Sequence, residues 1–258
     1  MLFFFLIAAN SFGQYNTAMH KIYSQNVKDS FEVYISRPVD YSPVKSYDII
    51  YYCDANLKSG KELRQQITGD NKLNKNGDYI FVGIGHIGNY HVLRRRDFIL
   101  PFISKGDTLP KSADYGHIKD FYTFLTKELI PSVDSSYHCS GKRTIIGHSL
   151  GGLFVFYCLF QNENVFTNYI ALSPALWIDS YSIYHFNKIS NSLKQESYLY
   201  LSAGSEETVN RILPGANVMN EFLKEKKYNS LKFEFKVHPG KTHNTQVPES
   251  LKHILKTL

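Results

Sequence analysis

The sequence predicts an α/β fold: a central, mostly parallel sheet with antiparallel strands at its N-terminal end and helices on both faces. Short apolar runs of strand length alternate with helical patterns along most of the chain, as is typical of parallel sheets. Of the 258 residues, 43% are hydrophobic and 20% are charged, which is ordinary globular usage. No internal repeat or linker-like stretch divides the chain, so we expect one domain over residues 14–258.

Residues 1–13 have the pattern of a secretory signal peptide. Their apolar run, residues 2–9, is much shorter than the roughly 20 residues that span a bilayer. Ser11 and Gly13 place small residues three and one before a cut ahead of Gln14, and no cysteine directly follows that cut to carry a lipid. We therefore expect an exported protein, periplasmic or secreted, with no stable membrane anchor. The alternative is that the apolar run is a buried first strand.

The next strands are predicted to be antiparallel and the later ones parallel. Residues 18–25 precede residues 30–36, in which apolar and polar side chains alternate as in a half-buried strand. Six later runs are mostly apolar, as expected of strands that are covered on both faces. They are residues 48–53, 79–84, 144–147, 169–172, 198–203 and 231–237.

Helical patterns lie between the later strands. Residues 114–130 carry apolar side chains at three- and four-residue steps, and we expect Pro131 to end that helix. Residues 150–161 are apolar on nearly all sides, as a helix packed against the middle of a sheet must be. Residues 216–227 and 247–258 form two more amphipathic patterns.

A glycine-rich motif coincides with the end of the strand predicted over residues 79–84. Gly83, Gly85 and Gly88 match the G-x-G-x-x-G pattern of dinucleotide-binding loops, which requires a helix directly after it. Residues 89–101 have no amphipathic pattern. We therefore expect a loop there, and no bound dinucleotide.

The charges of the chain are spread out. The net charge is +6, but the densest basic run, residues 94–96, is followed at once by Asp97. A nucleic-acid partner requires a clustered basic face, so we expect none. The three cysteines match no metal-binding spacing, and we expect neither a metal site nor a disulfide framework.

The motif with the clearest chemistry is G-H-S-L-G, residues 147–151. Ser149 follows a short β-branched run and precedes the apolar helix predicted over residues 150–161, which is the strand–turn–helix context of a nucleophile elbow. The glycines two before and two after the serine leave room for a sharp turn. The Leu150 N–H, at the positive end of the helix, can stabilise an oxyanion. The sequence therefore predicts that Ser149 is a catalytic nucleophile.

A serine nucleophile needs a base and an acid that orients the base. In this arrangement the acid and then the histidine follow the serine along the chain. Glu207 and Glu206 both follow the strand predicted over residues 198–203; Glu207 is the preferred acid and Glu206 the alternative. His243 lies in a polar loop after the last strand and is preferred as the base over His238, which ends that strand.

These residues resemble the putative-esterase branch of the α/β-hydrolase superfamily. That branch includes esterase D, enterobactin-type siderophore esterases, feruloyl and acetyl-xylan esterases and mycolyltransferases. The resemblance covers most of the chain, roughly residues 20–258. It is specific in residues 144–152 and 173–177, looser at the acid in residues 204–207, and extends to residues 243–244. It implies the α/β-hydrolase fold and a serine hydrolase that acts on a small-molecule ester without a metal or organic cofactor.

The resemblance also implies further site residues. A second oxyanion amide would come from Asn56, in a loop where the family has Leu-Asp-Gly and this chain has Cys-Asp-Ala at residues 53–55. Trp177 would line the pocket or pack beneath residues 178–197. Arg96 lies in a segment that resembles an Arg-Asp…Pro loop near the site entrance, where it would contact substrate or be held by local salt bridges.

The favoured function is a carboxylic-ester hydrolase that forms an acyl-enzyme. Its substrates would be siderophore esters, or hydroxycinnamoyl or acetyl esters of sugars, because basic and aromatic residues at 85–113 and 178–197 suit an anionic or aromatic acyl group. The alternatives are an acyltransferase that uses the same acyl-enzyme and a non-catalytic binding module with a relict site. The sequence does not specify the substrate or the oligomeric state.

Overall fold

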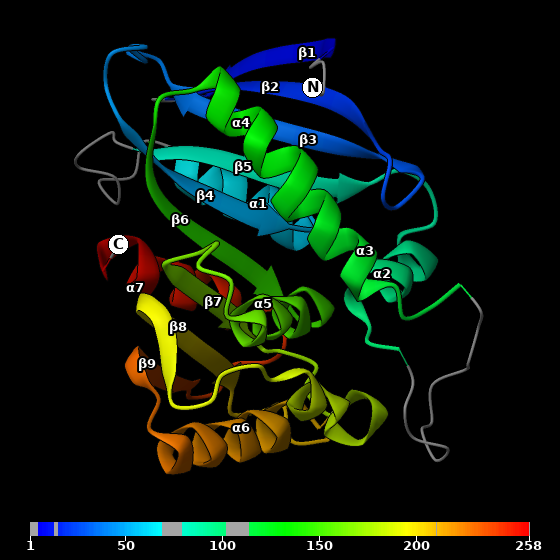
Figure 1. Cartoon of the computed structure of the whole chain (residues 1–258), viewed down its shortest axis with the longest axis vertical. Coiled ribbons are helices and arrows are strands. Elements are labelled where there is room, and N and C mark those ends of the chain that lie inside the picture. The colour runs from blue at the N-terminus through cyan, green and yellow to red at the C-terminus, as the bar shows by residue number, and fades with distance from the viewer. Residues whose placement is uncertain (1–4, 13–14, 69–78, 102–113, 210, 258) are drawn as a thin grey trace.

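A computed structural model of the chain describes residues 5–12, 15–68, 79–101, 114–209 and 211–257. These residues form a nine-stranded sheet with helices on both faces, as predicted (Figure 1). The strands are β1 (Phe5–Phe12), β2 (Tyr15–Ser24), β3 (Asp29–Pro38), β4 (Tyr47–Cys53), β5 (Tyr79–His86), β6 (Cys139–His148), β7 (Asn168–Leu172), β8 (Ser192–Gly204) and β9 (Asn229–His238).

The strand order is β1-β2-β3-β5-β4-β6-β7-β8-β9. The first three strands and the β3–β5 pair are antiparallel, and every other neighbouring pair is parallel. Strand β5 lies between β3 and β4, and β4 pairs with β6 in parallel. The carboxyl ends of β4 and β6 are therefore neighbours in the middle of the sheet. Loops that leave parallel strands at this edge meet one another, and the predicted catalytic residues lie in such loops.

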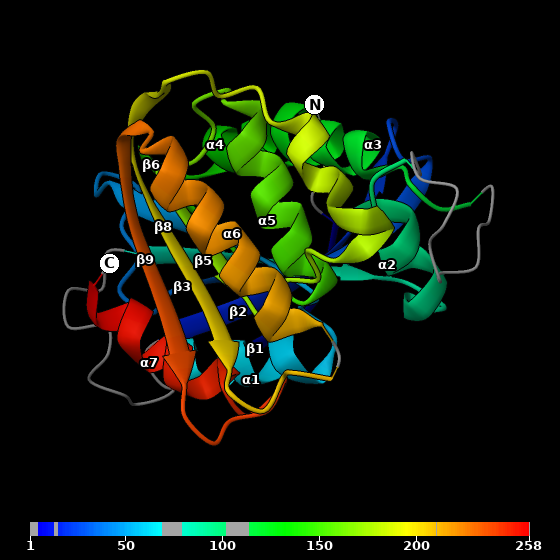
Figure 2. The ribbon, with the colours of Figure 1, turned by 90° about the horizontal axis from the view of Figure 1, so that it is seen from below.

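The helices cover the sheet as two layers (Figure 2). One face carries α1 (Lys58–Thr68) and α7 (Val247–Thr257), whose apolar side chains pack on one hydrophobic cluster. The other face carries α5 (Leu150–Gln161), which is buried from its second residue onward, and α6 (Ile212–Lys226). The all-round apolar pattern of residues 150–161 therefore reflects a helix enclosed between the sheet and its neighbours.

The helix predicted to end at Pro131 continues beyond it, so that prediction is wrong. The described helix consists of α3 (Ile118–Thr123), a π-helical segment η1 (Phe124–Leu129) and α4 (Ile130–Ser136). The Ile130 N–H donates to the Leu125 carbonyl, five residues back. The wider π turn gives the proline ring room, because it relieves the clash with the preceding turn that normally breaks a helix.

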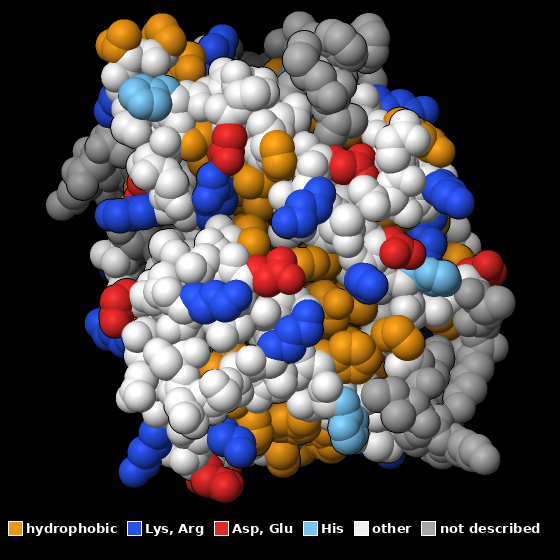
Figure 3. Space-filling view, in the orientation of Figure 1, with side chains coloured by type: hydrophobic (Ala, Val, Ile, Leu, Met, Phe, Trp, Pro, Cys, Tyr) orange, Lys and Arg blue, Asp and Glu red, His pale blue; other side chains and the backbone are white. Residues whose placement is uncertain are grey.

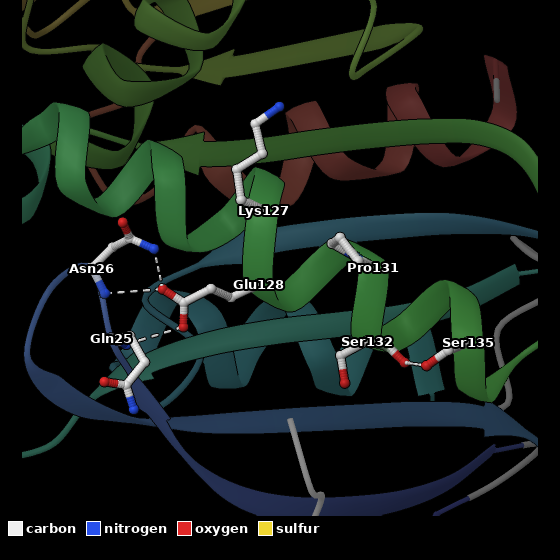
Figure 4. Close-up of a pocket in the computed structure, with 7 residues that line it drawn as sticks. All are labelled: Gln25, Asn26, Lys127, Glu128, Pro131, Ser132 and Ser135. Carbon is white, nitrogen blue, oxygen red and sulfur yellow. Dashed lines mark hydrogen bonds between the residues drawn. The ribbon is translucent and has the colours of Figure 1, made fainter. Parts of the chain in front are cut away.

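The π-helical segment also holds the β2–β3 turn. The Glu128 carboxylate accepts hydrogen bonds from the N–H groups of Gln25 (3.1 Å) and Asn26 (3.0 Å) and from the Ser24 hydroxyl (3.0 Å). Figure 4 shows the carboxylate directed at the turn, beside a surface pocket lined by η1 and α4. Glu128 therefore joins the antiparallel end of the sheet to the helical layer.

The loop predicted over residues 89–101 is instead largely a helix, α2 (Tyr90–Phe98), so this prediction is also wrong. Asn89 caps it by accepting a hydrogen bond from the His91 N–H, and ion pairs rather than an apolar stripe hold its polar face. The glycines before it are explained by packing: a side chain on Gly83 would collide with the Tyr52 ring, and one on Gly85 with the Asn56 side chain.

The N-terminal segment predicted to be a signal peptide pairs as the edge strand β1 with β2. Residues 1–4 and the predicted cut between residues 13 and 14 lie outside the described residues. Because β1 contacts the sheet at its outer edge, its removal would leave the remaining eight strands paired as described. The arrangement is compatible with a segment that is cut off after export.

The face of the molecule formed by α3 to α6 carries charges of both signs. Figure 3 shows Lys and Arg side chains interspersed with acidic and apolar ones over this face. Among the helices of the described residues, none combines the length and the apolar character that a membrane crossing requires.

Candidate active site

Ser149 lies at the turn between β6 and α5, where the sequence predicted a nucleophile elbow. Its backbone has φ 60° and ψ −116°, a conformation that residues other than glycine rarely adopt. Three backbone hydrogen bonds hold it: the Ser149 N–H donates to Leu172, and the Ser149 carbonyl accepts from Leu153 and Ala175. The turn is therefore fixed by both the neighbouring strand and the helix.

The glycines around Ser149 are required by close packing. A Cβ on Gly147 would lie 2.1 Å from the Gly151 carbonyl oxygen, and a Cβ on Gly152 would lie 2.9 Å from Pro174. The Gly151 position faces Cys53 and Asp54, at the end of β4. The helix can thus approach the strand ends closely enough for the turn to form.

Glu207 and His243 meet at the carboxyl ends of β8 and β9. Glu207 is buried, and its carboxylate accepts hydrogen bonds from His243 Nδ1 (2.5 Å), the Ser173 hydroxyl (2.6 Å) and the Gly204 N–H (2.6 Å). Burial raises the pKa of Glu207, but these hydrogen bonds outweigh it and hold the pKa below its usual value. Glu207 is therefore ionised and can fix the tautomer of the His243 ring.

The two alternative residues lie elsewhere. The Glu206 side chain is exposed, and its contact is with the Ser205 hydroxyl. His238 is buried beneath α7, where Nε2 lies 2.9 Å from the Ser250 hydroxyl and 3.2 Å from that of Tyr200. The structure thus brings the preferred pair together and leaves Glu206 and His238 outside it.

Ser149 and His243 face the same two pockets. The larger, of about 580 Å³, is mostly polar; its other lining residues include Asn56, Tyr90 and His148. The smaller, of about 350 Å³, is lined mostly by apolar side chains, among them Leu150, Ala175, Trp177, Ile178 and Ile212. His243 Nδ1 is engaged by Glu207, so Nε2 is the nitrogen left to meet the Ser149 hydroxyl. Among the described residues, no hydrogen bond joins that hydroxyl to His243 in this structure.

Both predicted oxyanion donors lie beside the nucleophile. Leu150 and Asn56 line the pockets on either side of Ser149, and neither backbone N–H has a hydrogen-bond partner among the described residues. Ala55, where the family has glycine, is buried without a positive φ, and its methyl group occupies space left by Gly83. The left-handed residue of this loop is Asp54, with φ 62°.

Sequence reasoning missed an ion pair that holds this loop. The Arg94 guanidinium donates twice to the buried Asp54 carboxylate, at 2.8 and 2.9 Å, and also lines both pockets. Arg96, for which the sequence left substrate contact and local salt bridges open, forms the salt bridges: it pairs with Asp97 and Asp29 and does not line the pockets that contain Ser149. The three consecutive arginines point in different directions once they lie on a helix, which explains why the sequence did not distinguish them.

Trp177 lies beside the pocket, which is one of the two positions that the sequence left open. Its ring lines the apolar pocket, and the Arg211 guanidinium lies 5.8 Å from the ring centroid. Arg95 lines the same pocket and lies 5.8 Å from the Tyr115 ring centroid. The rim therefore presents two cations beside aromatic rings.

His148 is a further residue of the site that the sequence did not single out. Its Nε2 donates to the His243 carbonyl oxygen at 2.8 Å, and the two ring centroids are 4.4 Å apart. Burial and then the neighbouring His243 lower the pKa of His148 to about 3, so its ring is neutral at neutral pH.

Comparisons with known proteins identify a family and a fold for the chain. The model of the family described as putative esterase matches residues 24–250. Ferri-bacillibactin esterase BesA of Bacillus subtilis (strain 168) is 28% identical over 257 residues, which cover 93% of this chain and 88% of BesA. The BES protein from Bacillus cereus matches with a TM-score of 0.80 and 30% identity, over 93% of this chain and 94% of that one. An IroE-like serine hydrolase from Shewanella oneidensis, 24% identical, shares the fold with a TM-score of 0.77, over 94% and 79% of the two chains.

Proposed function

Because the chain belongs to the putative esterase family, we propose that it is an exported esterase that cleaves siderophore esters through Ser149, His243 and Glu207. An ester-bond hydrolase follows from the family and its named relatives. The substrate, the catalytic residues and the export are the proposal. The observation that carries it is the His243–Glu207 hydrogen bond beside the two pockets that His243 shares with Ser149.

The first half of the reaction forms an acyl-enzyme. Ser149 Oγ attacks the ester carbonyl while His243 Nε2 takes the hydroxyl proton. The negative charge that develops on the carbonyl oxygen is stabilised by the N–H groups of Leu150 and Asn56. The carbon–oxygen bond to the alcohol then breaks, and His243 returns the proton to the departing oxygen. Glu207 stabilises the imidazolium that exists between these two steps.

The second half releases the acid. Water loses a proton to His243 Nε2 and attacks the carbonyl carbon of the acyl-enzyme. The bond to Ser149 Oγ breaks, the proton returns to that oxygen and the carboxylic acid departs. The same donors stabilise the second oxyanion, so no further group is needed.

The rim of the apolar pocket favours an anionic, aromatic acyl group. Arg95 and Arg211 supply positive charge, and Trp177 and Tyr115 supply aromatic faces. Catecholate siderophores combine aromatic rings with strong negative charge when they bind iron. The relative BesA is named as an esterase of ferri-bacillibactin. A siderophore ester therefore fits both the rim and the relatives better than an uncharged acetyl sugar does.

Replacement of the nucleophile tests the catalytic assignment. We expect Ser149→Ala to lower kcat for a p-nitrophenyl ester by at least about 10⁴-fold, because the acyl-enzyme cannot form. The wild-type protein should show a burst of p-nitrophenol and should be labelled by a fluorophosphonate at Ser149. Wild-type turnover in the folded variant would overturn the assignment, and absence of labelling in the folded wild type would favour a relict site.

A substrate panel tests the siderophore assignment. We expect the highest kcat/KM for a ferric catecholate trilactone, compared with the iron-free trilactone, a feruloyl sugar and an acetylated sugar. Mass analysis of the products in the presence of a sugar or alcohol acceptor separates hydrolysis from acyl transfer; we expect the free acid. Preferential cleavage of a sugar ester would overturn the siderophore assignment while leaving the esterase assignment intact.

A further inference from the structure

We propose that His148 is a positioning residue that holds the backbone of the His243 loop so that the His243 ring stays directed at Ser149. This inference rests on the proposed function. His148 directly precedes the nucleophile, and its side chain contacts the residue proposed as the base. It therefore connects two parts of the chain that are 95 residues apart.

The contact has a defined donor and acceptor. A carbonyl oxygen can only accept, so the 2.8 Å contact requires a proton on His148 Nε2. The two rings also pack against each other, with centroids 4.4 Å apart and planes inclined by 39°. This hydrogen bond and ring contact therefore link the residue before Ser149 directly to His243.

The loop that carries His243 is largely exposed. Thr242, Asn244 and Thr245 are all exposed, and His243 is half-buried. Backbone hydrogen bonds to the carbonyls of Lys241 and Thr242 hold the loop next to His243, and Glu207 holds one ring nitrogen of His243 itself. The bond from His148 supplies the second fixed point, on the backbone of the same residue.

A neutral side chain is suited to this position. His243 becomes positively charged when it takes the Ser149 proton, and a permanent cation in contact with it would oppose that step. The other charged group near His148 is Arg94, whose Nη2 lies 3.4 Å from the His148 carbonyl and whose charge is paired with Asp54. Burial keeps the His148 ring neutral. A histidine here donates a hydrogen bond without adding charge.

Three substitutions separate the hydrogen bond from the bulk of the side chain. His148→Phe keeps a ring without the donor, His148→Met has neither, and His148→Gln keeps an N–H donor in a chain of the same length as Met. For a p-nitrophenyl ester we expect kcat to fall about 10- to 100-fold in Phe and Met with KM changed less than about twofold, because the base is misplaced while binding persists. We expect His148→Gln to retain most of the wild-type kcat. Fluorophosphonate titration of active sites normalises kcat to folded protein.

A spectroscopic readout makes the test independent of turnover. The proton between His243 Nδ1 and Glu207 should give a far-downfield ¹H NMR resonance in the wild type, in His148→Gln and in the control His185→Phe, which alters an exposed histidine outside the pockets. We expect that resonance to broaden or disappear in His148→Phe and His148→Met. The inference would be overturned if the resonance and kcat were unchanged in His148→Phe and His148→Met. It would also be overturned if His148→Gln and His148→Met lost equal activity. An inactive wild type that still shows this pattern would refute only the proposed function.

Discussion

Ser149 illustrates how backbone conformation can present a side chain at a strand–helix turn, as the proposed reaction requires. A left-handed, strained serine costs on the order of 1–3 kcal/mol, and hydrogen bonds to both β7 and the first turn of α5 offset that cost. The strain places the hydroxyl at the N-terminal end of α5, above the sheet. Glycine at positions 147 and 151 is the sequence signature of that conformation, because a larger residue would collide at position 147 and would be tightly packed against Cys53 at position 151.

Replacement of the acid should reduce the rate without unfolding the protein. In Glu207→Gln the amide can donate to His243 Nδ1 and select the wrong tautomer, so we expect kcat to fall about 10³- to 10⁴-fold with KM little changed. Steady-state kinetics with a p-nitrophenyl ester would measure this. Glu206→Gln is the matched control, because that neighbouring side chain is exposed. A larger loss in Glu206→Gln than in Glu207→Gln would contradict the assignment of the acid.

The site should also contribute to loss of stability in acid. The pKa of His148 is lowered from 6.5 to about 3 in the folded protein, so only the unfolded chain takes up this proton as the pH falls below about 6.5. The free energy of unfolding therefore keeps the full contribution of the neutral His148 ring above about pH 6.5, and this contribution is lost progressively toward pH 3. Glu207 acts in the same direction below its usual pKa, because its folded-state pKa is lowered.

Urea unfolding between pH 7 and pH 4.5 measures this effect. We expect the free energy of unfolding to fall less steeply over that range in His148→Gln than in the wild type, because glutamine does not titrate. The variant's stability at pH 7 serves as its own reference. Identical slopes for the two proteins would show that His148 takes up its proton equally well in the folded state.

At the scale of single elements, the segment from α3 to α4 shows that a proline need not end a helix. Its π-helical turn accommodates Pro131 and places Glu128 toward the β2–β3 turn. π turns of this kind are frequent at functional sites. In this protein the π turn instead stabilises the turn between two antiparallel strands, which does not line the pockets that contain Ser149.

Removal of the Glu128 carboxylate should destabilise the protein without affecting the reaction. We expect Glu128→Ala to lower the free energy of unfolding by about 1–3 kcal/mol, because hydrogen bonds to a charged acceptor are lost and backbone donors in the turn lose their partner. Urea denaturation and kcat would be measured side by side. Glu225→Ala, at an exposed position on α6, is the control. A stability equal to that of the control would refute the role of Glu128.

At the scale of the whole molecule, the sheet order makes the N-terminal segment separable. In the part of the chain that the structure describes, β1 pairs with β2 alone and lies at the outer edge, far in strand order from β6, which leads into Ser149. We therefore expect that a chain starting at Gln14 keeps kcat and loses no more than about 4 °C in Tm, which is on the order of 1 kcal/mol. Thermal unfolding of the two purified forms would measure this.

Export is tested by the N-terminus of the mature protein. Mass analysis of protein recovered from the periplasm or the medium should show a chain that begins at Gln14. As a control, deletion of residues 1–24 also removes β2, which pairs with β3 along its whole length, and should lower Tm sharply. Recovery of the exported protein with residues 1–13 still attached would contradict the signal-peptide prediction.

Local patterns in the sequence were sufficient for the architecture and for the position of the sharp turn at Ser149. Continuous apolar runs identified the covered strands, and the all-round apolar character of residues 150–161 identified the central helix, because burial on both sides leaves a direct record in residue type. The elbow at Ser149 was recognisable because its conformation demands glycine at fixed spacings. In such cases the physical requirement lies within a few consecutive residues.

Contacts between distant segments were decided only by the tertiary structure. Three contacts join residues from different strand ends: Arg94 with Asp54, His148 with the His243 carbonyl, and Glu207 with His243. The last of these also explains why Glu207 is buried while Glu206 is exposed. Helix α2 was missed because ion pairs, not an apolar stripe, hold its polar side chains. Hydrogen bonds and ion pairs depend on where neighbouring strands end and how side chains point. Hydrophobic periodicity predicts only which side chains are buried, so it does not predict which polar groups pair with each other.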